Sequence, residues 1–157
     1  MPTAVVTWYE VWKTIHVLLA VIWVGGALML QVLALFALRS RLPGRKAEFA
    51  GEAEKVGMRI FAPAGLILLV MGFILVHQGH WGYHTWVVLA LIAYGLSFLT
   101  GILFLGPESG RIKRVIEAEG PDSPAVAARI QRILLVSRIE LAILLLIVVD
   151  MVLKPGQ

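Results

Sequence analysis

Histidine is the residue type in this chain whose spacing most clearly indicates chemistry. Three of the four histidines lie within the nine residues 76–84: His77, His80 and His84. The fourth, His16, lies in the first apolar segment. Imidazole is the commonest metal ligand in proteins and titrates near neutral pH. The chain has no cysteine, which excludes disulfides, thiolate-bound clusters and covalent c-type haem, so an imidazole-based metal or haem site is indicated.

The three clustered histidines are spaced by three and four positions. On a continuous helix this spacing puts their side chains on one face, where two histidines one turn apart can chelate a single ion. Gly79 and Gly82 interrupt the stretch, so a loop with exposed histidines is an equally good prediction. The choice depends on whether the second apolar helix ends at His77 or continues to His84.

Two polar residues within the apolar segments, His16 and Asp150, are expected to lie near the clustered histidines. His16 lies roughly 7–10 Å below the membrane surface if each helical residue rises about 1.5 Å. An ionisable group at that depth usually faces the bundle interior and serves a function. The alternative is a neutral histidine bonded to a backbone carbonyl. Asp150, expected at the same level, is a candidate metal ligand or hydrogen-bond partner of an imidazole, or else pairs with Lys154.

Long apolar segments identify the elements that must position these residues. The chain has 157 residues, 59% of them hydrophobic, and a mean hydropathy of +0.86, whereas soluble domains are about 45–50% apolar. Four segments come near the roughly 20 residues that cross a bilayer: 11–38, 60–77, 86–105 and 133–153. Their apolarity is continuous, so we predict helices. The predicted fold is an all-α, integral membrane, up-and-down four-helix bundle, with residues 1–157 as a single membrane domain.

Positive charge indicates the orientation of the bundle. All lysines and arginines except Lys13 and Lys154 lie in or beside the segments that join spans one to two and three to four. The positive-inside rule places both segments in the cytoplasm, and both termini and the histidine-rich stretch outside. We therefore predict a multi-pass protein of a bacterial cytoplasmic (inner) membrane. The net charge of +4 follows this topology and does not indicate a nucleic-acid partner. The first span lacks a basic start, so we expect no cleaved signal peptide.

The two joining segments differ in their predicted structure. Residues 43–59 mix acidic and basic side chains and suit an amphipathic helix that faces solvent. The second segment runs through Gly106-Pro107 and residues 120–124. The Gly-Pro cluster of 120–124 predicts a turn, with Asp122 or Ser123 as the N-cap of the last helix.

Polar residues deeper in the spans are expected to make structural contacts. Glu140 and Gln31 lie at a similar predicted depth, and we expect them to hydrogen-bond to each other. Tyr94, Ser97 and Gly101 are spaced by three and four positions on the third span. We therefore expect this face to turn inward.

Short motifs resemble known membrane families. Residues 15–26, IHVLLAVIWVGG, resemble a first-helix motif of three families: the copper-resistance D family, HemJ-type protoporphyrinogen oxidases, and the domain-of-unknown-function family 2269 of small bacterial integral membrane proteins. Residues 59–65 and 150–156 look most like the last family, and the resemblance covers essentially the whole chain. The likeness to HemJ-type proteins implies haem or porphyrin binding through His16. The likeness to the copper-resistance D family implies copper handling at the outer face. HemJ-type enzymes use a lysine in a later span, which this chain lacks, so their reaction is not implied.

The predicted function follows from the histidines, the topology and this resemblance. We predict a membrane protein that binds b haem or copper near its periplasmic, outer face and serves redox chemistry or metal handling. The predicted cofactor or metal ligands are His16, His77, His80 and His84, with Asp150 added for a metal ion. The alternative is a cofactor-free accessory or structural subunit that packs against a larger membrane complex. Predicted partners are the lipid bilayer and such a complex or a homo-oligomer, and no nucleic acid.

Overall fold

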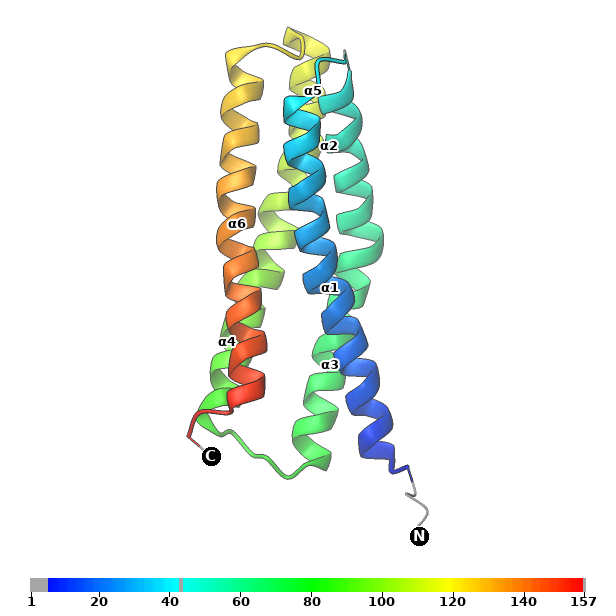
Figure 1. Ribbon diagram of the computed structural model, residues 1–157, viewed down its shortest axis with the longest axis vertical. Coiled ribbons are helices and arrows are strands. Elements are labelled where there is room, and N and C mark those ends of the chain that lie inside the picture. Colours follow the sequence, from blue (N-terminus) through cyan, green and yellow to red (C-terminus); the bar gives the residue numbers. More distant parts are fainter. Residues whose placement is uncertain (1–5, 43, 157) are drawn as a thin grey trace.

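Helices form every regular element that the computed structural model describes, in residues 6–42 and 44–156. They build four long rods that lie side by side and alternate in direction (Figure 1). Both ends of the described chain and residues 79–84 lie at one end of the rods, which we call the terminal end (Figure 1). The turns before the second and fourth rods lie at the opposite end, the turn end. The predicted all-α class is confirmed.

The first rod is a single helix and the second contains a π-helical turn. The first rod is α1 (Trp8–Arg39). The second runs without interruption from α2 (Arg45–Val56) through the π-helical turn η1 (Gly57–Phe61) into α3 (Ala62–Gln78). The amphipathic helix expected at 43–59 is therefore, from Arg45 onward, part of a longer rod that continues the second span toward the turn end, and residue 43 lies outside the described residues.

The third rod repeats this construction. It joins α4 (Thr85–Thr100), the π-helical turn η2 (Gly101–Leu105) and α5 (Gly106–Glu119). The sequence placed Gly106-Pro107 in a joining segment, but the helix continues through it. Pro107 is the second residue of α5 and directly follows the π-helical turn η2, where the regular α-helical hydrogen-bond pattern is interrupted. The fourth rod is α6 (Pro124–Leu153).

The caps of these helices follow from local sequence. The Thr7 hydroxyl accepts a hydrogen bond from the Glu10 amide at 3.3 Å, and the Glu10 carboxylate accepts one from the Thr7 amide at 2.8 Å, a capping box that starts α1. Gly120 ends α5 at a φ of 88°, which favours glycine. The Ser123 hydroxyl accepts from the Val126 amide at 3.2 Å. Ser123 is thus the N-cap of α6, one of the two predicted candidates.

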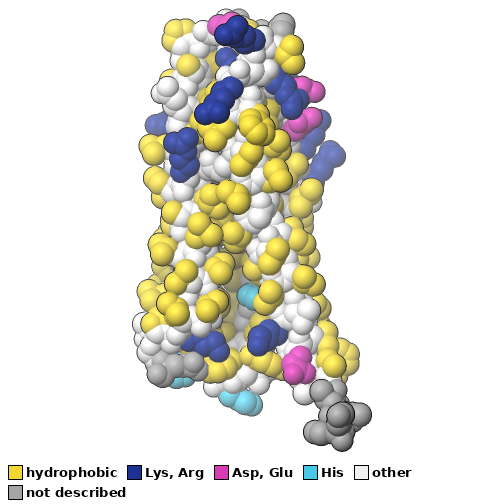
Figure 2. Space-filling model, in the orientation of Figure 1, with side chains coloured by type: hydrophobic (Ala, Val, Ile, Leu, Met, Phe, Trp, Pro, Cys, Tyr) yellow, Lys and Arg dark blue, Asp and Glu magenta, His cyan; other side chains and the backbone are white. Residues whose placement is uncertain are grey.

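Three rods are long and apolar enough to cross a membrane: Trp8–Arg39, Arg45–Gln78 and Thr85–Glu119. The fourth rod, with 30 residues, is of similar length. It differs because Arg138, Glu140 and Asp150 interrupt its apolar sequence. Most of the lysine and arginine side chains visible in Figure 2 lie toward the turn end and a few lie near the terminal end, where the visible histidines also lie.

A central cluster of Trp23, Leu68 and Tyr94 joins three of the rods near their middle. The Trp23 and Tyr94 ring centroids are 4.8 Å apart at an interplanar angle of 61°. The Tyr94 hydroxyl donates to the Gly65 carbonyl at 2.5 Å. A Cβ at Gly65 would lie 2.8 Å from the Phe98 ring, so glycine lets α4 approach α3 closely there.

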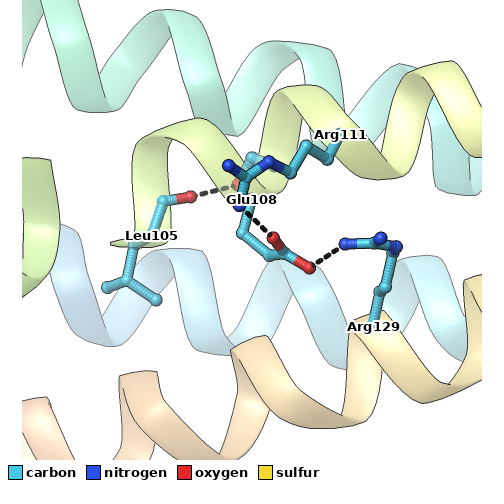
Figure 3. Close-up of polar contacts among 5 residues, drawn as sticks. Leu105, Glu108, Arg111 and Arg129 are labelled. Atoms are coloured by element: carbon cyan, nitrogen blue, oxygen red, sulfur yellow. Dashed lines mark hydrogen bonds and ion pairs between the residues drawn. The ribbon is translucent and has the colours of Figure 1, made fainter. Parts of the chain in front are cut away.

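A buried carboxylate joins α5 to α6 at the turn end. Glu108 is 2% exposed and accepts hydrogen bonds from Arg129 at 2.5 Å and Arg111 at 3.1 Å (Figure 3). A buried charge is costly unless it is paired and hydrogen-bonded, and both conditions are met here. The apolar core beside this ion pair consists of Ala50, Ile112, Ile116 and Val126. The turn end is therefore held by its own small core in addition to the central cluster.

Candidate functional site

His16 lies between α1 and α3 with one ring nitrogen buried and unpaired. A Cβ at Gly72 would lie 3.5 Å from Cε1 of His16, so the imidazole packs on the bare backbone of α3. Within the described residues, Nδ1 of His16 is buried and makes no hydrogen bond of standard geometry, while the Leu68 backbone of α3 lies within reach of the imidazole, as the alternative of a histidine bonded to a backbone carbonyl predicts. The expected inward orientation of His16 agrees with this packing. Such a nitrogen can coordinate a metal ion or form a hydrogen bond with a bound molecule.

Two further buried polar atoms near the terminal end lack a partner in the described part of the chain. They are Oδ2 of Asp150 and Nε1 of Trp86. Asp150 lies near the end of α6 and Trp86 near the start of α4, two helices that pack against each other. Each unsatisfied polar atom costs roughly 1–3 kcal/mol, so such atoms usually bind water, an ion or a ligand.

The packing register places Asp150 at the level of His16. Leu19 and Ala20 of α1 and Ile147 of α6 all pack against the central cluster. The two helices run in opposite directions (Figure 1). One helical turn from these contacts toward the terminal end therefore leads to His16 on α1 and to Asp150 on α6. A nitrogen donor and an oxygen donor thus occur at one depth, which agrees with the level expected from the sequence.

The three clustered histidines lie on the surface of the terminal end. The second rod ends at Gln78, so the helix does not continue to His84 and the three do not share one helical face. His77, His80 and His84 are all exposed, and His80 has a positive φ of 53°. A surface groove includes the first two of them in its lining: Phe73, Val76, His77, His80, Gly82, Tyr83 and Leu91.

The predicted ligands do not form one closed metal centre. Across residues 6–42 and 44–156, no three His, Asp or Glu side chains gather into a group that could hold a metal ion. His16 and Asp150 are interior groups, whereas the clustered histidines are surface groups. A metal centre in this region would therefore use one or two interior protein ligands, with the remaining positions filled by other molecules.

Aromatic side chains cover the terminal end of the interior. The Lys154 ammonium lies 4.0 Å from the Trp81 ring centroid and 5.5 Å from that of Trp86, a cation–π arrangement. The Trp81 indole donates to the Tyr9 hydroxyl at 3.2 Å. A Cβ at Gly79 would overlap the Trp81 ring, so this turn needs glycine. Lys154 thus contacts aromatic rings, and the alternative in which it forms an ion pair with the carboxylate four residues earlier is not observed.

A second polar group lies on the other side of the central cluster. Gln31 donates to the Ser137 hydroxyl at 2.8 Å, and the Ser97 hydroxyl donates to Glu140 at 3.0 Å. The expected hydrogen bond between Gln31 and Glu140 is wrong, because each residue bonds to a serine instead. Tyr94 and Ser97 are buried, so the predicted inward face of the third span is confirmed.

The sequence did not single out Trp86 as a candidate site residue. Its indole nitrogen is nevertheless one of the three buried side-chain atoms without a partner in the described residues. No spacing in the sequence connects it with Asp150, since the two residues belong to different helices. Only the packing of α4 on α6 brings them to the same end of the interior.

Comparison with known proteins identifies one family. The family described as "Predicted integral membrane protein (DUF2269)" matches residues 10–155, which is nearly the whole chain. No curated protein and no solved structure matches the chain. The match agrees with the three apolar rods and with the resemblance in the sequence motifs.

Proposed function

This chain belongs to the DUF2269 family of predicted integral membrane proteins, and from that premise we propose that its four rods cross a bacterial cytoplasmic membrane as an up-and-down four-helix bundle. Two acidic residues of α6 are compatible with a fourth crossing, because Glu140 bonds to Ser97 inside the rods and the Oδ2 atom of Asp150 is buried. The lysines and arginines gathered at the turn end support a cytoplasmic location for that end, with both termini outside (Figure 2).

Cysteine labelling tests this topology directly, because the chain has no cysteine of its own. Tyr83→Cys marks the terminal end and Glu119→Cys marks the turn end, both at exposed positions. We expect a membrane-impermeant maleimide to label Tyr83→Cys in intact spheroplasts and Glu119→Cys only after lysis. The opposite pattern, or labelling of both in intact spheroplasts, would refute the proposed orientation.

We further propose that the interior of the terminal end binds a transition metal, as haem iron or as a copper ion, with His16 as a ligand. The observation that carries this proposal is the buried Nδ1 of His16, which has no partner in the described residues. Imidazole ligates both copper and haem iron. Asp150 adds a carboxylate at the same level, which suits a second ligand or a proton acceptor. With this metal bound, the protein would serve either electron transfer or the handling of the metal itself.

The clustered histidines remain proposed partners of this site rather than observed ones. His77, His80 and His84 lie at the same end of the rods as His16, but on the surface. Their exposure suits ligands of an incoming ion, since an exposed imidazole needs little desolvation before it coordinates.

Spectroscopy and elemental analysis of the purified protein test the cofactor. We expect protein from cells grown with ample iron and copper to show either a haem Soret band that shifts on reduction, or about one copper per chain. His16→Ala should remove that signal, whereas Leu18→Ala, at an exposed position of the same helix, should keep it. A colourless, metal-free wild-type preparation would refute the proposal. If such a preparation co-purified with a stoichiometric membrane partner, the cofactor-free accessory subunit would be the better explanation.

A further inference from the structure

A cavity of about 170 Å³ lies inside the rods between the central cluster and the turn end. Its lining on α1 extends from Trp23 to Leu38, about 22 Å if each residue rises ~1.5 Å. Protein interiors rarely contain voids much larger than a water molecule. An apolar cavity of roughly 150 Å³ is large enough to bind a molecule such as benzene. The cavity therefore has room for one narrow, ring-sized guest.

Five polar side chains are among the residues that line this mainly apolar cavity: Gln31, Lys46, Ser109, Ser137 and Glu140. The serine hydrogen bonds described above use Oε1 of Glu140 and Nε2 of Gln31. In the described residues, Oε2 of Glu140 and the amide oxygen of Gln31 have no hydrogen-bond partner. Both remaining atoms are acceptors, so they match a guest that carries a hydrogen-bond donor.

An aromatic wall lies at the same depth. Trp23 and Phe98 line the cavity, with ring centroids 6.2 Å apart at an interplanar angle of 74°. Both rings also pack against Tyr94, so only their remaining surfaces line the cavity. Gly101 also lines this part of the cavity, and a Cβ there would lie 3.7 Å from Oε1 of Glu140. The missing side chain leaves space beside the carboxylate.

The two π-helical turns border the cavity from opposite rods. Gly57, Met58 and Phe61 of η1 contribute to its wall, and so do Gly101 and Ile102 of η2. A Cβ at Gly106, which directly follows η2, would lie 3.5 Å from the sulfur of Met58 in η1. The two turns therefore face each other. A π-helical turn inserts one residue into a helix and occurs frequently at functional sites. Two such turns at one level indicate a built cavity rather than a packing defect.

We propose that this cavity binds a small phenol-class lipophile, a single aromatic ring with an apolar substituent and a hydroxyl group. The ring would lie against Trp23 and Phe98, and the hydroxyl would donate to the free oxygen of Glu140. This site is separate from the proposed metal site. Its lining on α1 begins at Trp23, in the central cluster, and does not include His16. It therefore does not depend on the proposed metal function.

Tryptophan fluorescence tests this proposal, because Trp23 is part of the cavity wall. Bromine quenches an indole that it contacts, so 4-bromophenol and bromobenzene are suitable probes with and without the hydroxyl. The protein is used at full length in detergent micelles, and each titration is repeated with Trp23→Phe to isolate the Trp23 signal. We expect saturable quenching of Trp23 by 4-bromophenol in addition to the linear quenching that partition into micelles causes.

Matched variants separate the shape of the cavity from its polar group. Ala27→Leu places a larger side chain in the cavity lining, and Ala142→Leu makes the same change at an exposed position. We expect Ala27→Leu to abolish saturable quenching by both probes, while Ala142→Leu leaves it unchanged. Glu140→Gln should weaken 4-bromophenol at least about tenfold and bromobenzene less than about twofold, because a glutamine whose oxygen accepts from Ser97 turns an N–H group toward the guest in place of the free oxygen.

Two results would overturn the proposal. Purely linear quenching in the wild type, equal to that of Ala27→Leu, would show that the cavity takes no lipophile. Equal affinity of the wild type for 4-bromophenol and bromobenzene would show that Glu140 does not select a hydroxyl. Circular dichroism of each variant identifies any that fails to fold, and the comparison of the two probes on the wild type needs no variant of Glu140.

Discussion

Replacing Glu108 with glutamine is the most direct test of how the turn end is held together. The carboxylate is 2% exposed and both of its oxygens accept hydrogen bonds from arginines (Figure 3). Glu108→Gln keeps the shape and one acceptor oxygen, but removes the charge and points an amide N–H group at one guanidinium. The variant therefore loses one charge-assisted hydrogen bond and the neutralisation of two cations.

The expected cost follows from the exposure of the partners. Removing one partner of a fully buried ion pair costs about 3–5 kcal/mol, and one hydrogen bond to a charged group contributes about 1.5–3 kcal/mol. Arg111 and Arg129 are 56% and 38% exposed, so a released guanidinium can turn toward water. We therefore expect a loss of about 2 kcal/mol. For a chain of this length that corresponds to a melting temperature lower by roughly 4–8 °C.

The assay is thermal unfolding in detergent micelles, followed by far-UV circular dichroism. Glu117→Gln is the matched control, because Glu117 lies on the same helix and pairs with Lys113 at 3.9 Å with both side chains more than half exposed. Such exposed pairs one helical turn apart contribute about 0.3–0.5 kcal/mol, so the control should melt within ~2 °C of the wild type. If Glu108→Gln melted at the same temperature as Glu117→Gln, the buried ion pair would not stabilise the turn end.

Two further predictions concern helix packing and capping, each measured in the same unfolding assay. Gly26→Ala should destabilise the protein by about 1–3 kcal/mol, because a Cβ there would lie 2.6 Å from the Phe61 ring. Gly25→Ala, with nothing within 4 Å, should be neutral or slightly stabilising, and equal effects would contradict the packing argument. Ser123→Ala should cost about 1 kcal/mol through loss of the N-cap of α6. Asp122→Ala should cost less than half of that, because Asp122 is 93% exposed; the reverse order would contradict the capping assignment.

Local sequence predicted most of the fold because its signals act over a few residues. The apolar segments at 11–38 and 133–153 lie within α1 and α6, and those at 60–77 and 86–105 lie within the second and third rods. The turn before α6 was predicted from its glycine and proline residues, and Ser123 caps the helix as one of two candidates. Helix periodicity, capping and turn formation all depend on near neighbours in the chain, so they can be read from the sequence.

The π-helical turns and the length of the rods were not predicted. The charged sequences 45–56 and 106–119 predict joining segments when considered alone, but they continue the apolar helices. Ala50 of α2 and Ile112 of α5 belong to one buried core, and Glu108 is neutralised by an arginine from α6. These contacts lie between rods, so hydropathy along one segment does not reveal them.

The sequence by itself determined that the chain is helical and apolar enough for a membrane, and that its histidines gather at one end. The tertiary structure decided which of them share an interior. It placed His16 on the bare backbone of α3 at the level of Asp150, and left His77, His80 and His84 on the surface. The physical reason is that hydropathy and spacing are properties of one helix. Which buried atoms remain unpaired depends on the packing register of α1, α4 and α6 against one another.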